Sequence, residues 1–390
     1  MVPLPPQIQP TRFSGLATSL QKTVTILGLL FVFLMGIQCL GDGFKLLGQD
    51  LLNAFFATTE NPFIALMVGI LATTLVQSSS VTTAMIVGLV AASENPLPIA
   101  NAIPMVMGAN IGTTVTNSLV ALAHVARKDE FFRAFSVATC HDFFNFIAVA
   151  ILLPLELATG YLRLTAGVLV SSLGGIGGIQ YQSPLKNALK MGIDPIKQLV
   201  RGLLQGQVSQ AVLLILVSGV MIVCALFLLV RVMRSATESR VEAFITRSLS
   251  RSVLLSMLVG VIVTVMVQSS SITTALLVPL AGAGLLTLES AFPVTLGANL
   301  GTTVTALLAT LAVSGPNAEA GVEIALVHVL FNLSGIVLIY PLKPIRRLPL
   351  MAARKLAGVA VRSRKWALIY VLGLFYGLPA AFVIVHRLFE

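Results

Sequence analysis

The sequence predicts an all-α integral membrane protein with two inverted repeats, each containing a re-entrant hairpin and a discontinuous transmembrane helix. Three observations predict this fold: few charged residues, a set of motifs that occurs twice, and basic residues that gather between apolar segments. Of the 390 residues, 56% are hydrophobic and only 10% are charged, whereas soluble domains are about a quarter charged. We therefore expect hydrocarbon to surround most of the chain.

Long apolar stretches with at most one charged residue supply the expected membrane-spanning helices. A helix needs about 20 apolar residues to cross the hydrocarbon core, and seven segments approach or exceed this length: 23–40, 99–123, 134–153, 208–230, 287–313, 323–340 and 366–385. Two further apolar segments, 62–90 and 254–284, carry a polar motif near the middle. Each arm is long enough for about half of the bilayer, which suits a re-entrant hairpin. A single long spanning helix is the alternative.

The basic residues indicate the orientation of these segments. The net charge of +10 comes mainly from clusters around 127–133, 231–251 and 343–365. Cytoplasmic loops of membrane proteins are rich in Lys and Arg, so the charge predicts a lipid bilayer as partner and no nucleic acid. Under this rule the two repeats have opposite orientations and the C-terminus lies outside. The three cysteines lie in apolar runs and predict neither a disulfide framework nor a metal site.

Three motifs occur twice in the same order. Residues 76–84 (VQSSSVTTA) match 267–275 (VQSSSITTA), and 108–116 (GANIGTTVT) match 297–305 (GANLGTTVT), each pair differing at one position. The third motif is His-x-x-x-Asn at His141 and again at His328. Matched order and similar spacing indicate a duplicated unit, which is a common plan for secondary transporters.

These features divide the chain into five parts. We expect an N-terminal amphipathic segment at 1–22, with a second amphipathic piece at the outer interface at 45–59. Repeat 1 covers 23–153, with its hairpin at 62–90 and its broken span at 99–123. An outer linker at 154–207 leads to repeat 2 at 208–342, with hairpin 254–284 and broken span 287–313. A basic loop and a final transmembrane helix occupy 343–390.

The composition of the motifs suits a site for ions. Gly and Asn within a span relax helical geometry, and broken backbone within a membrane is tolerated where it lines a cavity or is buried in protein. Half-helix N-termini favour anions and C-termini favour cations. Ser and Thr hydroxyls can donate to an anion, and amide oxygens can bind a cation. A bound cation would then strengthen anion binding. Helix packing is the alternative role of such small polar residues, but their duplication favours a site.

Asp142 and the two histidines need separate interpretation. An intramembrane carboxylate marks a functional site by default, and Asp142 has no counterpart in repeat 2, where Val329 stands. It is a cation ligand, a proton carrier or a carboxylate that reaches the inner interface. His141 and His328 are expected to be hydrogen-bonded packing residues. An intramembrane hydrolase using Ser, His141 and Asp142 is disfavoured, because neighbouring residues on a helix point about 100° apart and no nucleophile elbow is present.

The doubled motifs, together with residues 129–161, resemble the type II sodium–phosphate cotransporters, which include renal and intestinal carriers of animals and their bacterial relatives. The resemblance implies electrogenic symport of sodium and inorganic phosphate by alternating access, in a bacterial inner (plasma) membrane, with sodium as coupling ion and no other cofactor. A sodium-coupled carrier of another small anion, a dicarboxylate or sulfate, is the alternative. The large disulfide-bonded outer loop of the animal members is absent from this sequence.

The resemblance also implies which residues form the sites. The implied phosphate ligands are Gln77, Ser78, Ser79, Ser80, Asn110, Thr113, Ser270, Ser271 and Asn299. The implied sodium ligands are Gln268, Ser269, Thr302 and Thr305, with Asp142 and Asn145 at an additional sodium. His124 and Arg127 stand where members of this family often carry Gln and Asp, which argues against a further sodium site at that loop.

Overall fold

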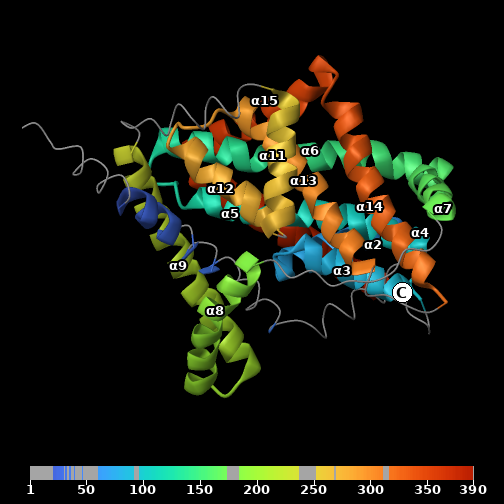
Figure 1. Ribbon diagram of the computed structural model, residues 1–390, viewed down its shortest axis with the longest axis horizontal. Coiled ribbons are helices and arrows are strands. Elements are labelled where there is room, and N and C mark those ends of the chain that lie inside the picture. The colour runs from blue at the N-terminus through green and yellow to red at the C-terminus, as the bar shows by residue number, and fades with distance from the viewer. Residues whose placement is uncertain are drawn as a thin grey trace, which may run out of the picture.

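The computed structural model describes residues 21–29, 31–32, 35–36, 39, 46, 60–91, 96–173, 184–236, 252–267, 269–310 and 316–389. All regular secondary structure in these residues is helical (Figure 1). Three of the described helical stretches are long and apolar enough to cross a membrane: Lys128–Thr159, Ala318–Ile339 and Arg364–His386. The prediction of an all-α membrane protein is confirmed at this level. Most of residues 1–22 and 45–59 lie outside the described residues.

The helices of the two repeats follow the same order along the chain. Repeat 1 contains α2 (Pro62–Val76), α3 (Ser79–Val90), α4 (Ile99–Thr113), α5 (Val115–Leu122) and α6 (Lys128–Thr159). Repeat 2, predicted at 208–342, begins with α9 (Gln207–Ala236) and continues with α11 (Val253–Val267), α12 (Ser270–Gly282), α13 (Leu288–Thr310) and α14 (Ala318–Ile339). In both repeats the last two serines of the Gln-Ser-Ser-Ser motif are the first residues of a helix, α3 in repeat 1 and α12 in repeat 2.

Glycines allow α2 to pack closely against the backbone of α4, and α11 against that of α13. A Cβ atom on Gly108 of α4 would overlap the carbonyl oxygen of Leu66 on α2, and one on Gly297 of α13 would overlap that of Met257 on α11. Further glycines on these helices meet the opposite helix in the same way: Gly69, Gly112, Gly260 and Gly301. Small residues at such contacts let membrane helices approach closely, so the glycines specify two equivalent helix pairs, α2–α4 and α11–α13.

The expected breaks in the two spans are mostly absent. Helices α4 and α5 meet at Thr114, whose φ of −75° and ψ of −18° remain helical, so repeat 1 contains only a local tightening. Helix α13 runs from Leu288 to Thr310 without interruption, so the prediction of a break at 297–303 is wrong. The physical reason is that Gly297 and Gly301 provide close packing against α11 rather than unwinding of the helix.

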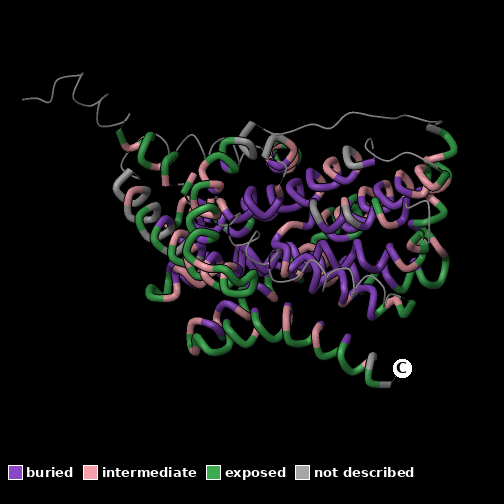
Figure 2. Tube along the Cα trace, turned by 90° about the horizontal axis from the view of Figure 1, so that it is seen from below, coloured by how far each residue is buried: buried purple, intermediate pink, exposed green. Residues whose placement is uncertain are grey.

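The two repeats pack against each other through α3 and α12. Helix α3 packs against α13 and α14, while α12 packs against α5 and α6. A methyl group added at Gly321 of α14 would meet Ala91 beside the end of α3, and one at Gly282 of α12 would meet Ala134 of α6. When the repeated motifs are aligned, these two contacts join equivalent positions with the repeats exchanged. Each repeat therefore covers the long helix of the other, around a buried centre (Figure 2).

The segment between the repeats is largely helical. Helix α6 continues past the predicted end of the span at 153 to Thr159, and Gly160 ends it in a left-handed conformation with φ of 65°. Helix α7 (Tyr161–Leu173) then packs against α14, and α8 (Pro184–Leu203) leads to α9, which corresponds to the first predicted span of repeat 2. In Figure 1, α7 and α8 lie at opposite ends of the molecule.

The basic segment after repeat 2 is a helix, so the prediction of a loop is wrong. Helix α15 (Lys343–Arg362) packs along α6. Its buried residues recur at helical spacing and are mostly small: Leu350, Ala353, Ala357 and Ala360. The basic residues occupy the remaining face. The chain then continues through α16 (Arg364–Leu368), a π-helical segment (Ile369–Gly377) and α17 (Leu378–Phe389). Many large apolar side chains of this final stretch are exposed (Figure 2), as lipid contact requires.

Candidate functional site

The first Gln-Ser-Ser-Ser motif forms the junction between α2 and α3. Gln77 ends α2 in the left-handed conformation, with φ of 56° and ψ of 27°, and is the one non-glycine residue with positive φ among those described. This conformation costs a residue other than glycine about 1–2 kcal/mol. The Gln77 side chain offsets part of this cost, because its Nε2 donates to the Thr74 carbonyl and its Oε1 accepts from the Thr116 hydroxyl at 2.7 Å.

The second Gln-Ser-Ser-Ser motif caps the start of α12. Gln268 lies outside the described residues, but the Ser269 hydroxyl accepts a hydrogen bond from the Ile272 N–H at 3.3 Å and forms the N-cap. Ser270 and Ser271 occupy the first turn and are buried. One turn later the Thr274 hydroxyl lies within hydrogen-bond distance of Asn117 Oδ1 on α5, at 2.9 Å, and of the Ser270 carbonyl of its own helix, at 2.8 Å. The start of α12 is therefore fixed against repeat 1.

Asn299 on α13 is held entirely by residues of repeat 1. Its Nδ2 donates to Asn145 Oδ1 at 2.9 Å, and its Oδ1 lies 2.6 Å from His141 Nε2. The other ring nitrogen, His141 Nδ1, lies 3.3 Å from Asn117 Nδ2. Because Asn145 Nδ2 donates to the Asn110 backbone carbonyl, Asn145 Oδ1 accepts from Asn299 Nδ2, which leaves Asn299 Oδ1 to accept from His141 Nε2. The proton of the His141 ring therefore sits on Nε2 and is donated to Asn299.

Asn110 on α4 is held mainly by residues of repeat 2. Its Oδ1 accepts from Asn332 Nδ2 at 3.3 Å and lies 3.4 Å from His328 Nε2, both on α14. Its backbone carbonyl accepts from Asn145 Nδ2 at 2.8 Å. Asn145 thus links Asn110 to Asn299, so a single buried chain of hydrogen bonds connects α4, α6, α13 and α14. The third motif supplies this chain: in each repeat, His and Asn bind the span of the other repeat.

Asp142 lies beside this chain and is completely buried. Its Oδ2 accepts from the hydroxyls of Tyr370 at 2.7 Å and Ser118 at 3.3 Å. The Thr114 hydroxyl also interacts with the carboxylate, but it donates to the Ile111 carbonyl at 2.8 Å, so within the described part of the chain Oδ1 has no hydrogen-bond donor. A buried carboxylate oxygen without a donor is costly, and a cation bound at Oδ1 would remove that cost.

The threonines expected at the site bind mainly to their own helices. The Thr113 hydroxyl donates to the Ala109 carbonyl at 2.8 Å, and that of Thr302 donates to the Ala298 carbonyl at 3.1 Å. Each oxygen keeps lone pairs that can face a cation. The Thr305 hydroxyl is buried with no hydrogen-bond partner in the described residues. Ser79 and Ser80 are buried at the start of α3, whereas Ser78 is partly exposed.

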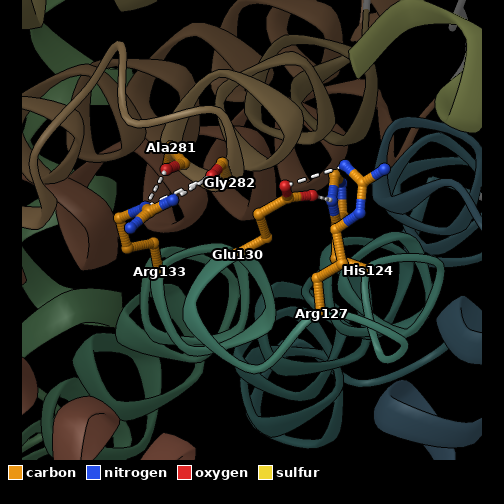
Figure 3. A network of polar contacts seen from close by, with 6 residues as sticks. All are labelled: His124, Arg127, Glu130, Arg133, Ala281 and Gly282. Carbon is orange, nitrogen blue, oxygen red and sulfur yellow. Dashed lines mark hydrogen bonds and ion pairs between the residues drawn. The ribbon is translucent and has the colours of Figure 1, made fainter. Parts of the chain in front are cut away.

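A second polar network joins the repeats where α12 ends (Figure 3). Arg133 on α6 donates to the last carbonyls of α12, with Nη2 lying 2.8 Å from the Gly282 oxygen. One turn earlier on α6, Glu130 is nearly buried and pairs with Arg127 at 3.0 Å, and it lies 3.8 Å from His124 Nδ1. His124 and Arg127 thus lie beside Glu130 in the first turn of α6, and Arg133 caps the helix of the other repeat.

Some residues of the network were not expected from the sequence. Asn332 was recognisable, because it ends the repeated His-x-x-x-Asn motif. Asn117 and Ser118 directly follow the first Gly-Ala-Asn motif, but repeat 2 has Ala306 and Leu307 there, so the repeat itself gave no signal. Tyr370 lies outside both repeats, and no motif distinguishes it.

Comparisons with known proteins give a consistent result. A model of the Na+/Pi-cotransporter family matches residues 32–176 and 221–351. "Sodium-dependent phosphate transport protein 2A" of Rattus norvegicus is 34% identical over 437 residues, covering 95% of this chain and 68% of that protein. "Sodium-dependent phosphate transport protein 2B" of Homo sapiens is 31% identical over 449 residues, covering 92% of this chain and 64% of that protein. No solved structure matches the chain.

Proposed function

Because the chain belongs to the Na+/Pi-cotransporter family, we propose that it couples the entry of inorganic phosphate to sodium moving down its gradient. The family is one of transporters, so the intramembrane hydrolase alternative is rejected. The observation that carries the proposal is the buried chain of hydrogen bonds through Asn110, Asn145 and Asn299, with the open oxygen of Asp142 beside it. It places polar groups of both repeats together within an apolar protein.

The phosphate site is proposed at the starts of α3 and α12. Free N–H groups at a helix N-terminus favour an anion, and the second and third serines of each motif lie in those first turns: Ser79, Ser80, Ser270 and Ser271. Gln77, Ser78, Asn110, Thr113 and Asn299 complete the proposed set. Side-chain hydroxyls and amides donate to phosphate oxygens without adding positive charge, so bound sodium supplies the charge that balances the anion.

The sodium sites are proposed from oxygen ligands. The first uses Gln268, Ser269, Thr302 and Thr305, of which Thr305 has a buried hydroxyl without a hydrogen-bond partner among the described residues. The second uses Asp142 and Asn145. Since Asp142 adds a negative charge to a buried site, a sodium ion there would allow net positive charge to move with phosphate. We therefore propose electrogenic transport.

The transport cycle is proposed to be alternating access, with the two repeats inverted in the plasma (inner) membrane. Support comes from the reciprocal packing of α3 on α14 and α12 on α6. In this arrangement α3 and α12 each carry a serine-rich start and lie against the opposite repeat. A shift of one repeat against the other would therefore move both serine motifs relative to Asn110 and Asn299.

Purified protein in liposomes tests the proposal. An inward sodium gradient should drive accumulation of labelled phosphate, and an equal potassium gradient should not. A negative interior potential, set with valinomycin and potassium, should accelerate uptake. In Asp142→Asn this dependence on potential should fall, because the sidechain charge is lost.

Competing anions distinguish the alternative carriers. Excess unlabelled phosphate should abolish uptake, whereas sulfate and a dicarboxylate should leave at least about half of it. Equal phosphate uptake with and without a sodium gradient would exclude the symport. Stronger competition by sulfate or a dicarboxylate would keep the sodium coupling but replace the substrate.

A further inference from the structure

The C-terminal helix reaches into the site through one side chain, Tyr370. This residue follows both repeats, and it also lies outside the residues 32–176 and 221–351 that match the family. Its hydroxyl is 2.7 Å from Asp142 Oδ2 on α6. A helix that is not part of the duplicated unit thus contacts the acidic residue that is itself not duplicated.

The Tyr370 ring is held by aromatic neighbours on two elements. Phe135 and Phe143 of α6 have ring centroids 6.3 and 6.5 Å from the tyrosine ring, and Phe375 of its own segment lies at 6.0 Å. Aromatic pairs at these separations are favourable contacts. Because three rings fix the tyrosine, its hydroxyl is fixed on Asp142 as well.

Tyr370 also lies in an unusual part of the backbone. Residues Ile369–Gly377 form a π-helix, a wide helical turn that is rare and occurs frequently at functional sites. This segment packs against α2 and α5. The former ends at Gln77 and the latter carries Ser118, which is the second donor to Asp142. The segment therefore contacts α2 and α5, and through Tyr370 it also contacts α6. All three helices border the proposed sites.

Both hydroxyl donors bind the same oxygen of the carboxylate. Tyr370 and Ser118 donate to Oδ2, while Oδ1 has no hydrogen-bond partner in the described residues. Two donors on one oxygen restrict rotation of the carboxylate and leave the other oxygen open. A cation bound at Oδ1 would complete the coordination of this carboxylate.

We propose that Tyr370 is a positioning residue for the coupling cation: by holding Oδ2, its hydroxyl keeps Oδ1 of Asp142 directed at bound sodium. This inference rests on the proposed function, because it assigns sodium to Asp142. It adds a role for the final helix, which makes sodium binding depend on how that helix is docked against α6.

The test is Tyr370→Phe, which keeps the ring and removes the hydroxyl. In phosphate uptake by liposomes, the sodium concentration for half-maximal rate should rise about tenfold, the size expected for losing a hydrogen bond to a charged group. The maximal rate at saturating sodium, and the half-saturating phosphate measured there, should change by less than about twofold. A structural defect would instead lower the maximal rate.

Tyr161→Phe is the matched control, because the Tyr161 hydroxyl also makes an interhelical hydrogen bond, to Ser334 at 3.1 Å, between α7 and α14. It should leave sodium half-saturation unchanged. In an Asp142→Asn background, Tyr370→Phe should have no further effect on sodium. Sodium-induced thermal stabilisation of the detergent-purified variants measures binding independently of transport and should weaken in Tyr370→Phe as well.

The outcomes separate this inference from the proposed function. If uptake by the unmodified protein ignores sodium, the proposed function fails. If uptake requires sodium and Asp142→Asn weakens sodium binding, but Tyr370→Phe behaves like Tyr161→Phe, only the role of Tyr370 is overturned. If Tyr370→Phe raised sodium half-saturation equally in the unmodified protein and in the Asp142→Asn background, the role of Tyr370 would also be overturned. Ser118→Ala removes the longer bond to Oδ2 and should shift sodium half-saturation in the same direction but less.

Discussion

His141 and His328 hold equivalent positions in the two repeats but have different surroundings. His141 has a partner at each ring nitrogen, Asn117 at 3.3 Å and Asn299 at 2.6 Å. His328 approaches Asn110 at 3.4 Å through Nε2, and its Nδ1 is buried without a hydrogen-bond partner among the described residues. The difference follows from one position, because repeat 2 has Ala306 where repeat 1 has Asn117. The hydrogen bonding of the repeated histidine is therefore complete in repeat 1 but not in repeat 2.

This difference predicts unequal costs for the same substitution. His141→Ala removes two hydrogen bonds and leaves Asn117 Nδ2 and Asn299 Oδ1 each without one, and an unsatisfied buried polar group costs about 1–3 kcal/mol. His328→Ala removes one long contact, and Asn110 still accepts from Asn332. Because both substitutions remove the same side chain, each serves as the control for the other.

We expect His141→Ala to lower the thermal unfolding temperature of the detergent-purified protein clearly more than His328→Ala does. The difference should correspond to about 1–3 kcal/mol. Equal losses, or a larger loss for His328→Ala, would show that the ring nitrogens do not contribute as these distances indicate.

At the scale of elements, the glycines of the repeated Gly-Ala-Asn motifs hold helix pairs together. A side chain on Gly108 or Gly297 would overlap backbone atoms of the facing helix, and a rigid backbone cannot move aside as a side chain can. Gly88 on α3 provides the contrast, since a Cβ there would meet nothing within 4 Å. A Gly→Ala substitution is therefore expected to lower stability at Gly108 and Gly297 but not at Gly88.

We expect Gly108→Ala and Gly297→Ala each to destabilise the protein by at least about 1–3 kcal/mol, the usual cost of overpacking, and to lower the yield of folded protein. Gly88→Ala should be neutral or slightly stabilising, because Ala favours helix over Gly by up to about 1 kcal/mol. Thermal unfolding and size-exclusion profiles of the purified variants measure both effects. Normal stability of Gly108→Ala would mean that α2 and α4 are too far apart for a Cβ at Gly108 to meet the Leu66 carbonyl.

The helix pairs also show what the sequence could predict and where its signal was ambiguous. The repeated motifs identified Asn110, Asn145 and Asn299, and the structure joins these residues in one hydrogen-bonded chain. The same glycines suggested a broken helix at 297–303, because Gly permits both unwinding and close packing. Only the position of the facing helix decides between the two, and that position is not local information.

Two other features, helix α15 and the contact of Tyr370, could not be predicted from the local sequence. The basic residues of 343–362 suggested a loop, although Leu350, Ala353 and Ala357 recur at helical spacing and are buried against the rest of the protein. Tyr370 had no signal at all, because its role depends on a contact with Asp142 across more than two hundred residues of sequence. Duplication reveals residues that act in pairs, and it is silent about those that occur once.

At the scale of the whole molecule, the two contacts between repeats have different electrostatic character. Where α12 ends, Arg133 of α6 caps its last carbonyls, and Arg127 lies at the N-terminal end of the same α6 helix (Figure 3). Where α3 ends, Ala91 lies against Gly321, and the described loop residues 96–98 carry no charge. Since cytoplasmic loops are rich in Lys and Arg, the end of α12 is expected inside and the end of α3 outside. This assignment is what inverted repeats require.

Labelling of single cysteines tests the inversion directly. In a variant lacking Cys39, Cys140 and Cys224, one cysteine is placed at Pro96 after α3 or at Thr287 after α12, both exposed. A membrane-impermeant maleimide applied to intact cells should label position 96 and not 287. Applied to inside-out vesicles, it should label 287 and not 96. Detergent-solubilised samples, where both should react, control for accessibility.

Labelling from one side at both positions would show that the repeats are parallel. The reciprocal packing would then remain, because a twofold axis along the membrane normal also exchanges α3–α14 with α12–α6. What would change is the mechanism. Parallel repeats would bring both serine motifs toward the site from the same side, and alternating access would then come from rocking of one repeat against the other. The labelling pattern therefore decides whether the two serine motifs approach the site from opposite sides of the membrane or from one side.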